Sequence, residues 1–114
     1  MKVNLKINLD GEEKLDLNVL GIKNDNTIKY LENDISVLIT TFKNKIIIER
    51  KHPDYQVNLN LELNKDTLST YSFTNGFKTF SLHTSTKKLE ISENRIYAKY
   101  ILEDNEFIFT LEVI

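Results

Sequence analysis

The sequence predicts an all-β protein, an up-and-down antiparallel β-barrel of about 8–10 strands. Three observations predict it. Apolar and polar residues alternate with a period of two through most of the chain, the links between these segments are short turns, and no window fits the spacing of an amphipathic helix better than alternation. At 114 residues the chain has room for one hydrophobic core, so we expect a single domain over residues 1–114.

The N-terminal segment shows the clearest alternation. Apolar residues occupy every second position from 3 to 9, Asp10-Gly11 provides a tight reversal, and the alternation resumes from 15 to 19. The same pattern recurs at 57–63 and 107–113. Each of these segments therefore predicts a strand with one face toward the core and one toward water.

Shorter runs between these strands are bounded by Asn, Asp, Lys or Gly. They lie at 27–32, 35–42, 45–51, 67–73, 78–84, 87–92 and 95–102. Pro53, in "KHPDY", suits a turn between two of them because it has no N–H to donate. The connections are too short for the crossovers of a β-sandwich, and a closed meander leaves no strand edge unpaired, so a barrel is favoured.

Charge and composition exclude several classes of protein. The net charge of −2 and the pI of about 5.7 lack the basic excess of a nucleic-acid-binding domain, and a mildly acidic surface repels anionic membranes. The sequence contains no cysteine, so it has no thiolate nucleophile and no cysteine-based zinc site. It contains no signal-peptide pattern and no apolar run of membrane-spanning length, so we expect a cytoplasmic location with neither a nucleic acid nor a membrane as partner.

Arg50 is the first candidate binding residue. If Ile46 and Ile48 face the interior, Arg50 does too; the opposite parity would bury Glu49 and Lys51. Because an unpaired buried ion costs several kcal/mol, the first arrangement is favoured. An interior guanidinium suits an anionic group on an otherwise apolar ligand. The alternatives are that Arg50 pairs with an internal Glu or with carbonyls, or that it reaches the rim.

Tyrosines supply further candidates for the interior. Tyr100 shares its parity with Ile96, Ala98 and Leu102, and Tyr71 is a second candidate to line a cavity; the alternative for each is an ordinary aromatic core position. The two histidines lack the spacing of metal ligands, and Ser85 lacks a nucleophile-elbow motif. We therefore expect no catalytic residue, no metal and no cofactor, and we do not expect an enzyme.

One stretch resembles a known family. In "YSFTNGFKTFSLHTSTKKLEI", Tyr71 is followed by Gly76, and "TSTK" from Thr84 to Lys87 leads into a strand. These features resemble the YwiB-like family of small, uncharacterised bacterial proteins. The terminal "YAKYILEDNEFIFTLEVI" is similar to that family's closing hairpin.

Two upstream motifs extend the resemblance. "IKYLEND" and "IIIER" look like the family's Tyr-x-Glu hairpin and its apolar strand ending in Arg, which places Tyr30, Glu32 and Arg50 on family positions. The resemblance implies a lipocalin-like (calycin-like) barrel. Because the family has no established activity, it implies fold and not function.

Two functional hypotheses follow. In the first, a non-enzymatic barrel binds a small apolar or anionic molecule in its lumen, with Arg50, Tyr71 and Tyr100 as binding residues. In the second, side chains fill the barrel and its outer surface contacts other proteins. Outward parity at Ile47, Ile101 and Ile108 would then provide an apolar strip for pairing with another copy.

Overall fold

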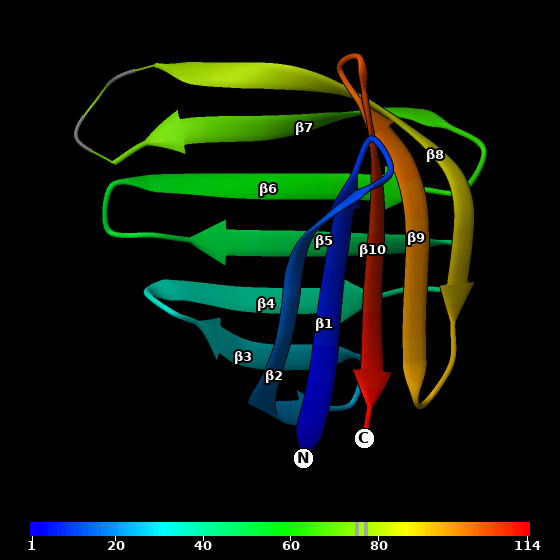
Figure 1. The fold of residues 1–114 in the computed structure, drawn as a ribbon. Coiled ribbons are helices and arrows are strands. Elements are labelled where there is room, and N and C mark those ends of the chain that lie inside the picture. The colour runs from blue at the N-terminus through cyan, green and yellow to red at the C-terminus, as the bar shows by residue number, and fades with distance from the viewer. Residues whose placement is uncertain (75, 77) are drawn as a thin grey trace.

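Ten antiparallel strands close into a barrel in the computed structural model, which describes residues 1–74, 76 and 78–114 (Figure 1). Neighbouring strands in the chain pair with each other, and β1 pairs with β10 to complete the ring. This confirms the all-β up-and-down barrel. The strands are β1 (Lys2–Leu9), β2 (Glu12–Asn24), β3 (Thr27–Glu32), β4 (Ile35–Thr41), β5 (Lys45–Lys51), β6 (Tyr55–Glu62), β7 (Asp66–Phe73), β8 (Thr79–Ile91), β9 (Arg95–Leu102) and β10 (Asn105–Val113).

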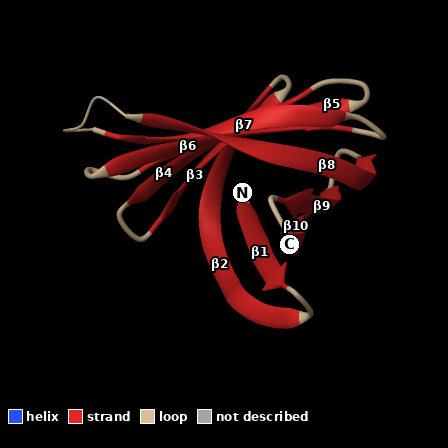
Figure 2. Cartoon of the chain, turned by 90° about the horizontal axis from the view of Figure 1, so that it is seen from above, coloured by secondary structure: helices blue, strands red, loops and turns tan. Residues whose placement is uncertain are grey.

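The barrel is built as two layers of strands that cross. Strands β3 to β7 run across the direction of β1, β9 and β10, and the view from above shows β2 and β8 curving away from the crosswise set (Figures 1 and 2). Strands that pass from one layer to the other form the corners of such an arrangement. Consistent with that role, β2 and β8 are the longest strands, at 13 residues each.

One expectation about the strands is wrong. The segments 78–84 and 87–92 are parts of the single strand β8, where the register with β9 shifts between Thr86 and Lys88. A similar shift in the pairing of β1 with β2 falls between Ile7 and Asn8. Such β-bulges bend a strand without ending it, so both long strands stay continuous through the corner.

Alternating side chains line the interior. The buried apolar residues are Val3, Leu5, Ile28, Tyr30, Val37, Ile39, Ile46, Ile48, Leu59, Leu61, Ile96, Ala98, Tyr100, Phe109 and Leu111. In β5 the burial pattern places Ile46 and Ile48 inside while Ile47 between them is half-buried. The period of two predicted from the sequence is therefore the period of the core.

Two ladders are incomplete. Strands β2 and β3 pair only where Gly21–Asn24 meets Thr27–Tyr30, so β2 diverges from β3 beyond Gly21. Strands β6 and β7 stop pairing after Asn58. There, side-chain hydroxyls replace backbone partners: the backbone N–H of Asn60 donates to Oγ of Ser69 at 3.0 Å, and the Thr67 hydroxyl donates to the Asn60 carbonyl. The second gap is thus closed by hydrogen bonds, which keeps its buried backbone groups satisfied.

The β1–β2 turn has the backbone that the sequence predicts. Asp10 and Gly11 have φ values of 49° and 86°, as a two-residue hairpin turn with a primed geometry requires. In the part of the chain that the structure describes, no helix is long and apolar enough to cross a membrane.

Candidate functional site

A cavity of about 260 Å³ lies in the lumen toward one end of the barrel. The end is the one where β5 and β9 finish, because Arg50 and Leu102 come from their last residues, and where β6 and β10 begin. Most of its wall is apolar. It is lined by Ile7, Ile48, Arg50, Val57, Leu59, Tyr100, Leu102, Phe107 and Phe109.

The charged group in this wall forms an ion pair. Nη2 of Arg50 donates a hydrogen bond to Oε2 of Glu32, and the side chains are 20% and 5% exposed, respectively. The pair joins β5 to β3, which lie on either side of β4. Tyr30 pairs with Val37 and Val37 pairs with Arg50, and Glu32 is the next residue of β3 on the buried face. Of the alternatives for Arg50, an internal glutamate is therefore the partner observed.

Two buried tyrosines belong to the same electrostatic environment. Burial raises the pKa of Tyr30 well above its usual range, although the Arg50 charge lowers the pKa in part and the Glu32 charge raises it. Burial likewise raises the pKa of Tyr100, again opposed by Arg50. The Tyr100 ring stacks on Phe107, with ring centroids 5.4 Å apart. Both hydroxyls therefore stay protonated well beyond neutral pH.

Two oxygen atoms beside the ion pair have no protein partner. The Tyr30 hydroxyl and Oε1 of Glu32 are buried without a hydrogen bond to any described residue. Buried polar atoms in folded proteins are nearly always hydrogen-bonded, so these two oxygens are unusual, although neither residue lines the cavity. The cluster of Tyr30, Glu32, Arg50 and Tyr100 is named the ion-pair cluster below.

The residues predicted from the sequence are only partly brought together. Arg50 and Tyr100 line the same cavity, whereas Tyr71 lines a neighbouring hollow of about 560 Å³ with Phe73 and Phe80. Tyr71 belongs to a run of aromatic rings in which it stacks on Tyr55 at 5.5 Å and meets Phe73 edge-on at 5.2 Å. A ligand-binding role for Arg50, Tyr71 and Tyr100 stays a prediction.

Of the two cluster residues that the parity argument did not identify, Tyr30 and Glu32, the glutamate is the partner of Arg50. It lies in β3, whose burial pattern places Ile28, Tyr30 and Glu32 on one face. A carboxylate on the buried parity of a strand is a usable signal, because such a group needs a partner. Within the described ranges, no group of His, Asp or Glu is arranged to hold a metal ion.

No family model and no curated protein sequence matches the chain. The chain is similar to the crystal structure of the ywiB protein from Bacillus subtilis, with a TM-score of 0.64 and 18% sequence identity over 97% of this chain and 87% of that one. At this identity the likeness shows the fold alone, a small closed β-barrel like that of ywiB.

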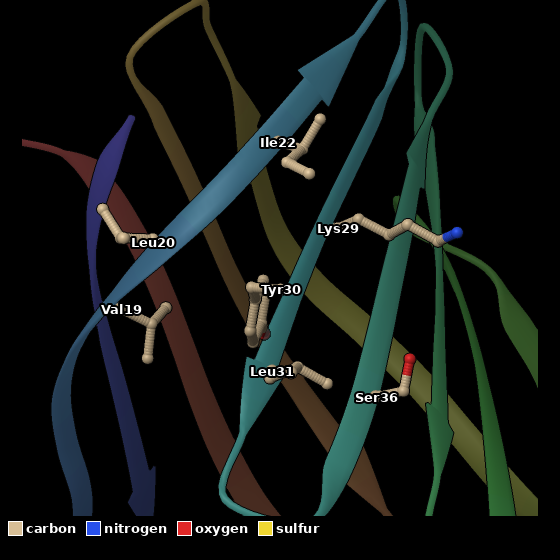
Figure 3. Close-up of a pocket in the computed structure, with 7 residues that line it drawn as sticks. All are labelled: Val19, Leu20, Ile22, Lys29, Tyr30, Leu31 and Ser36. Carbon is tan, nitrogen blue, oxygen red and sulfur yellow. The ribbon is translucent and has the colours of Figure 1, made fainter.

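A third hollow lies on the outside, where β2 and β3 diverge. The groove has a volume of about 600 Å³ and is bordered by Leu20, Ile22 and Leu31, which are 74%, 71% and 66% exposed (Figure 3). Tyr30, between these strands, also reaches its wall (Figure 3). The strip expected at Ile47, Ile101 and Ile108 is less exposed, since all three side chains are half-buried.

Proposed function

We propose that the barrel binds a small, largely apolar molecule in its lumen, with its polar end at Arg50 and Tyr100. The observation that carries the proposal is the cavity of about 260 Å³, whose wall is apolar except at these two residues. Ligand pockets typically combine such a wall with a few polar groups that fix orientation. Their usual volumes begin at about 300 Å³, so the cavity suits a small molecule. The lipocalin-like character and cytoplasmic setting expected from the sequence belong to this proposal.

The side chains around the cavity favour ligand binding in the lumen over a barrel that is filled by side chains. Ile48, Leu59 and Phe109 are buried and form its inner wall, whereas Ile7 and Leu102 are half-buried. The inner wall therefore offers apolar surface that water solvates poorly, and the ligand would gain about 25 cal/mol for each Å² of apolar surface that it removes from water.

Octanol is a suitable probe because it combines a short apolar chain with one hydroxyl. At ~0.5 kcal/mol per non-hydrogen atom, its dissociation constant should be on the order of 0.1–1 mM. Titration followed by NMR should shift the methyl resonances of Ile48 and Leu59 in a saturable way. The matched pair of variants is Val57→Phe, which adds a ring inside the cavity, and Asn58→Phe, which adds the same ring on the opposite face of β6.

The two variants decide the location. Octanol binding should be lost in Val57→Phe and retained in Asn58→Phe. Native mass spectrometry of protein purified without denaturation provides a second readout, in which a retained small molecule should disappear in Val57→Phe. Saturation that survives the inner substitution, or no saturable shift in the wild-type protein, would overturn the proposal.

The exposed apolar side chains along the outer groove favour a second candidate function, association with another copy of this chain. Residues 12–20 of β2 pair with β1 but not with β3, so one side of this stretch is an unpaired strand edge beside Leu20 and Leu31. An unpaired edge is complementary to another edge of the same kind. A dimer in native mass spectra that is lost in Leu20→Ser with Leu31→Ser would support it; a monomer at all concentrations would rule it out.

A further inference from the structure

We infer that the polar end of the lumen ligand is uncharged and carries both a hydrogen-bond acceptor and a donor, as a primary carboxamide does. The inference rests on the proposed lumen site and names the chemical class of its ligand. Sequence reasoning alone points to an anion at Arg50, because a lone guanidinium is a site for a carboxylate. The ion-pair cluster changes that expectation.

The charges of the ion-pair cluster disfavour an anionic polar end on the ligand. The Arg50 guanidinium is already in contact with the carboxylate of Glu32, so the pair has no net charge to offer. Glu32 is one of the most enclosed polar residues in the barrel, with 3% of its surface exposed. A ligand carboxylate at Arg50 would place a second negative charge beside it, where solvent screens the repulsion poorly. An uncharged polar end avoids this repulsion.

The hydrogen-bonding groups of the cluster also favour a carboxamide over a carboxylate. A guanidinium has five N–H donors, and the pair with Glu32 engages Nη2, so Arg50 can donate to an acceptor in the cavity that it lines. Tyr100 is the other polar residue that lines the cavity, and its hydroxyl can accept a hydrogen bond as well as donate one. A carboxylate has no hydrogen to donate to it, whereas an amide N–H₂ does. The carboxamide therefore matches both Arg50 and Tyr100.

The size of the cavity limits the apolar part of the ligand. Arg50 and Tyr100 are the polar residues that line a cavity of about 260 Å³, and the remaining wall is made by aliphatic and aromatic side chains such as Leu59 and Phe109. A short chain or a single ring behind the carboxamide fits this shape. Octanamide and octanoate are matched probes, because they have the same chain and the same number of non-hydrogen atoms.

The test compares the two probes on the wild-type protein at neutral pH, by calorimetry or NMR titration. Octanamide should bind at least about tenfold more tightly than octanoate, which corresponds to ~1.4 kcal/mol. If octanoate binds equally well or better, the inference is overturned while the lumen proposal stands. If neither probe binds, the lumen proposal is overturned as well.

Glu32→Gln should reverse the order of affinity of the two probes. It removes the negative charge and leaves the guanidinium without an ionic partner, so octanoate should gain at least about tenfold in affinity and overtake octanamide. An unchanged ranking in a folded Glu32→Gln protein would contradict the role assigned to the ion pair. Because the wild-type comparison needs no variant, the inference can be refuted even if Glu32→Gln does not fold.

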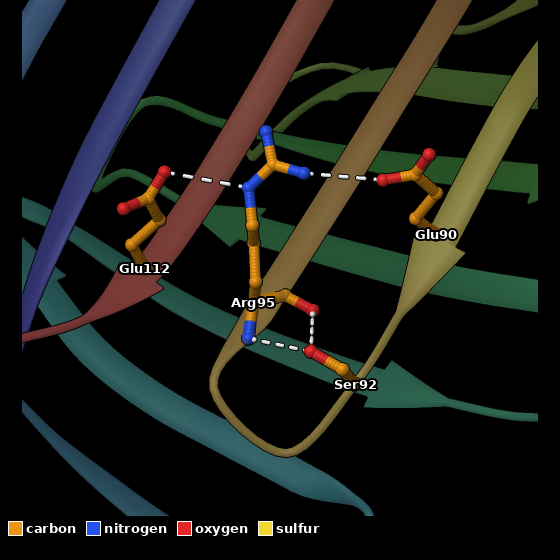
Figure 4. A network of polar contacts seen from close by, with 4 residues as sticks. All are labelled: Glu90, Ser92, Arg95 and Glu112. Carbon is orange, nitrogen blue, oxygen red and sulfur yellow. Dashed lines mark hydrogen bonds and ion pairs between the residues drawn. The ribbon is translucent and has the colours of Figure 1, made fainter.

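A matched control removes a carboxylate elsewhere. Glu90 accepts a hydrogen bond from Nη1 of Arg95 at 3.1 Å, and Glu112 accepts one from Nε of the same residue at 3.3 Å (Figure 4). Both carboxylates are more than half exposed. Glu90→Gln therefore makes the same chemical change in an arginine network on the surface, and it should leave the ranking of the two probes as in the wild type.

Discussion

Replacing Arg50 with methionine should lower the free energy of unfolding by about 3 kcal/mol. Removing one partner of a buried ion pair typically costs about 3–5 kcal/mol, because the other charge is left unpaired. The Glu32 side chain is 5% exposed, whereas the Arg50 side chain is 20% exposed, so water can reach part of the space that the guanidinium leaves. The lower end of the range is therefore expected.

The double variant separates charge from packing. Glu32→Gln alone should cost a similar ~3 kcal/mol, so independent effects would sum to about 6 kcal/mol. Combining it with Arg50→Met removes both charges, and we expect a total cost of only about 1 kcal/mol, since neutral replacements of buried pairs are often nearly neutral in stability. The difference measures the coupling between the two side chains.

Urea unfolding followed by far-ultraviolet circular dichroism is the assay. Tyrosine fluorescence is a second probe, since the chain has no tryptophan. The midpoint of the Arg50→Met transition should fall while its slope stays constant. A cost below about 1 kcal/mol for each single variant, or a double variant that costs the full sum, would refute the view that Glu32 and Arg50 depend on each other.

Two other predictions concern the tyrosines and the first turn. Burial raises the pKa of Tyr30 and Tyr100, so the folded protein keeps two protons that the unfolded chain releases above pH ~10. The stability that these two tyrosines contribute should therefore be fully present below that pH, and above it should fall by ~1.4 kcal/mol per pH unit for each tyrosine. Urea titrations across alkaline pH should show a slope that Tyr100→Phe halves, and a slope identical in both proteins would contradict this. Gly11→Ala should cost about 1–2 kcal/mol, since φ is 86° there and an added Cβ would meet no atom within 4 Å, so the cost is one of backbone strain. Gly11→Asn should recover part of it in the same urea assay, and an Ala variant as stable as the wild type would contradict the assigned turn.

Parity could be predicted from the sequence because it depends on the chain within a single strand. Ile46, Ile48 and Arg50 must share a face once the segment is extended, and burying two isoleucines decides which face it is. The same reasoning places Tyr100 inside with Ala98. For these residues, local alternation and the cost of burying charge are sufficient.

The partner of Arg50 could not be predicted in that way. Glu32 meets Arg50 because the β3–β4 and β4–β5 ladders place Tyr30 level with Arg50, through Val37, and Glu32 is the next buried residue along β3. Register across strands depends on turn geometry and on packing of the whole barrel, neither of which a single strand reports. The resemblance to a family pattern placed these residues on shared positions but did not indicate their contact.

The sequence also did not indicate where strands pass from one layer to the other. The predicted segments 78–84 and 87–92 leave Ser85 and Thr86 as a link between two strands, yet both residues lie within the continuous strand β8. A β-bulge needs no characteristic residue, so the alternation simply changes phase and suggests two strands. The divergence of β2 from β3 is another result of the corner, and it leaves Leu20 exposed where alternation alone predicts nothing unusual.

The ladder between β1 and β10 affects how the chain can fold. Val3 lies opposite Val113, whereas the other ladders join strands that are consecutive in the sequence. Hairpins of the consecutive kind form locally, but this ladder cannot form until β10 has been synthesised, and it carries the largest loop-closure entropy. During synthesis the outer edge of β1 therefore remains open to intermolecular β-pairing. A chaperone that shields this edge, or rapid completion of the last strand, would limit aggregation of the nascent chain.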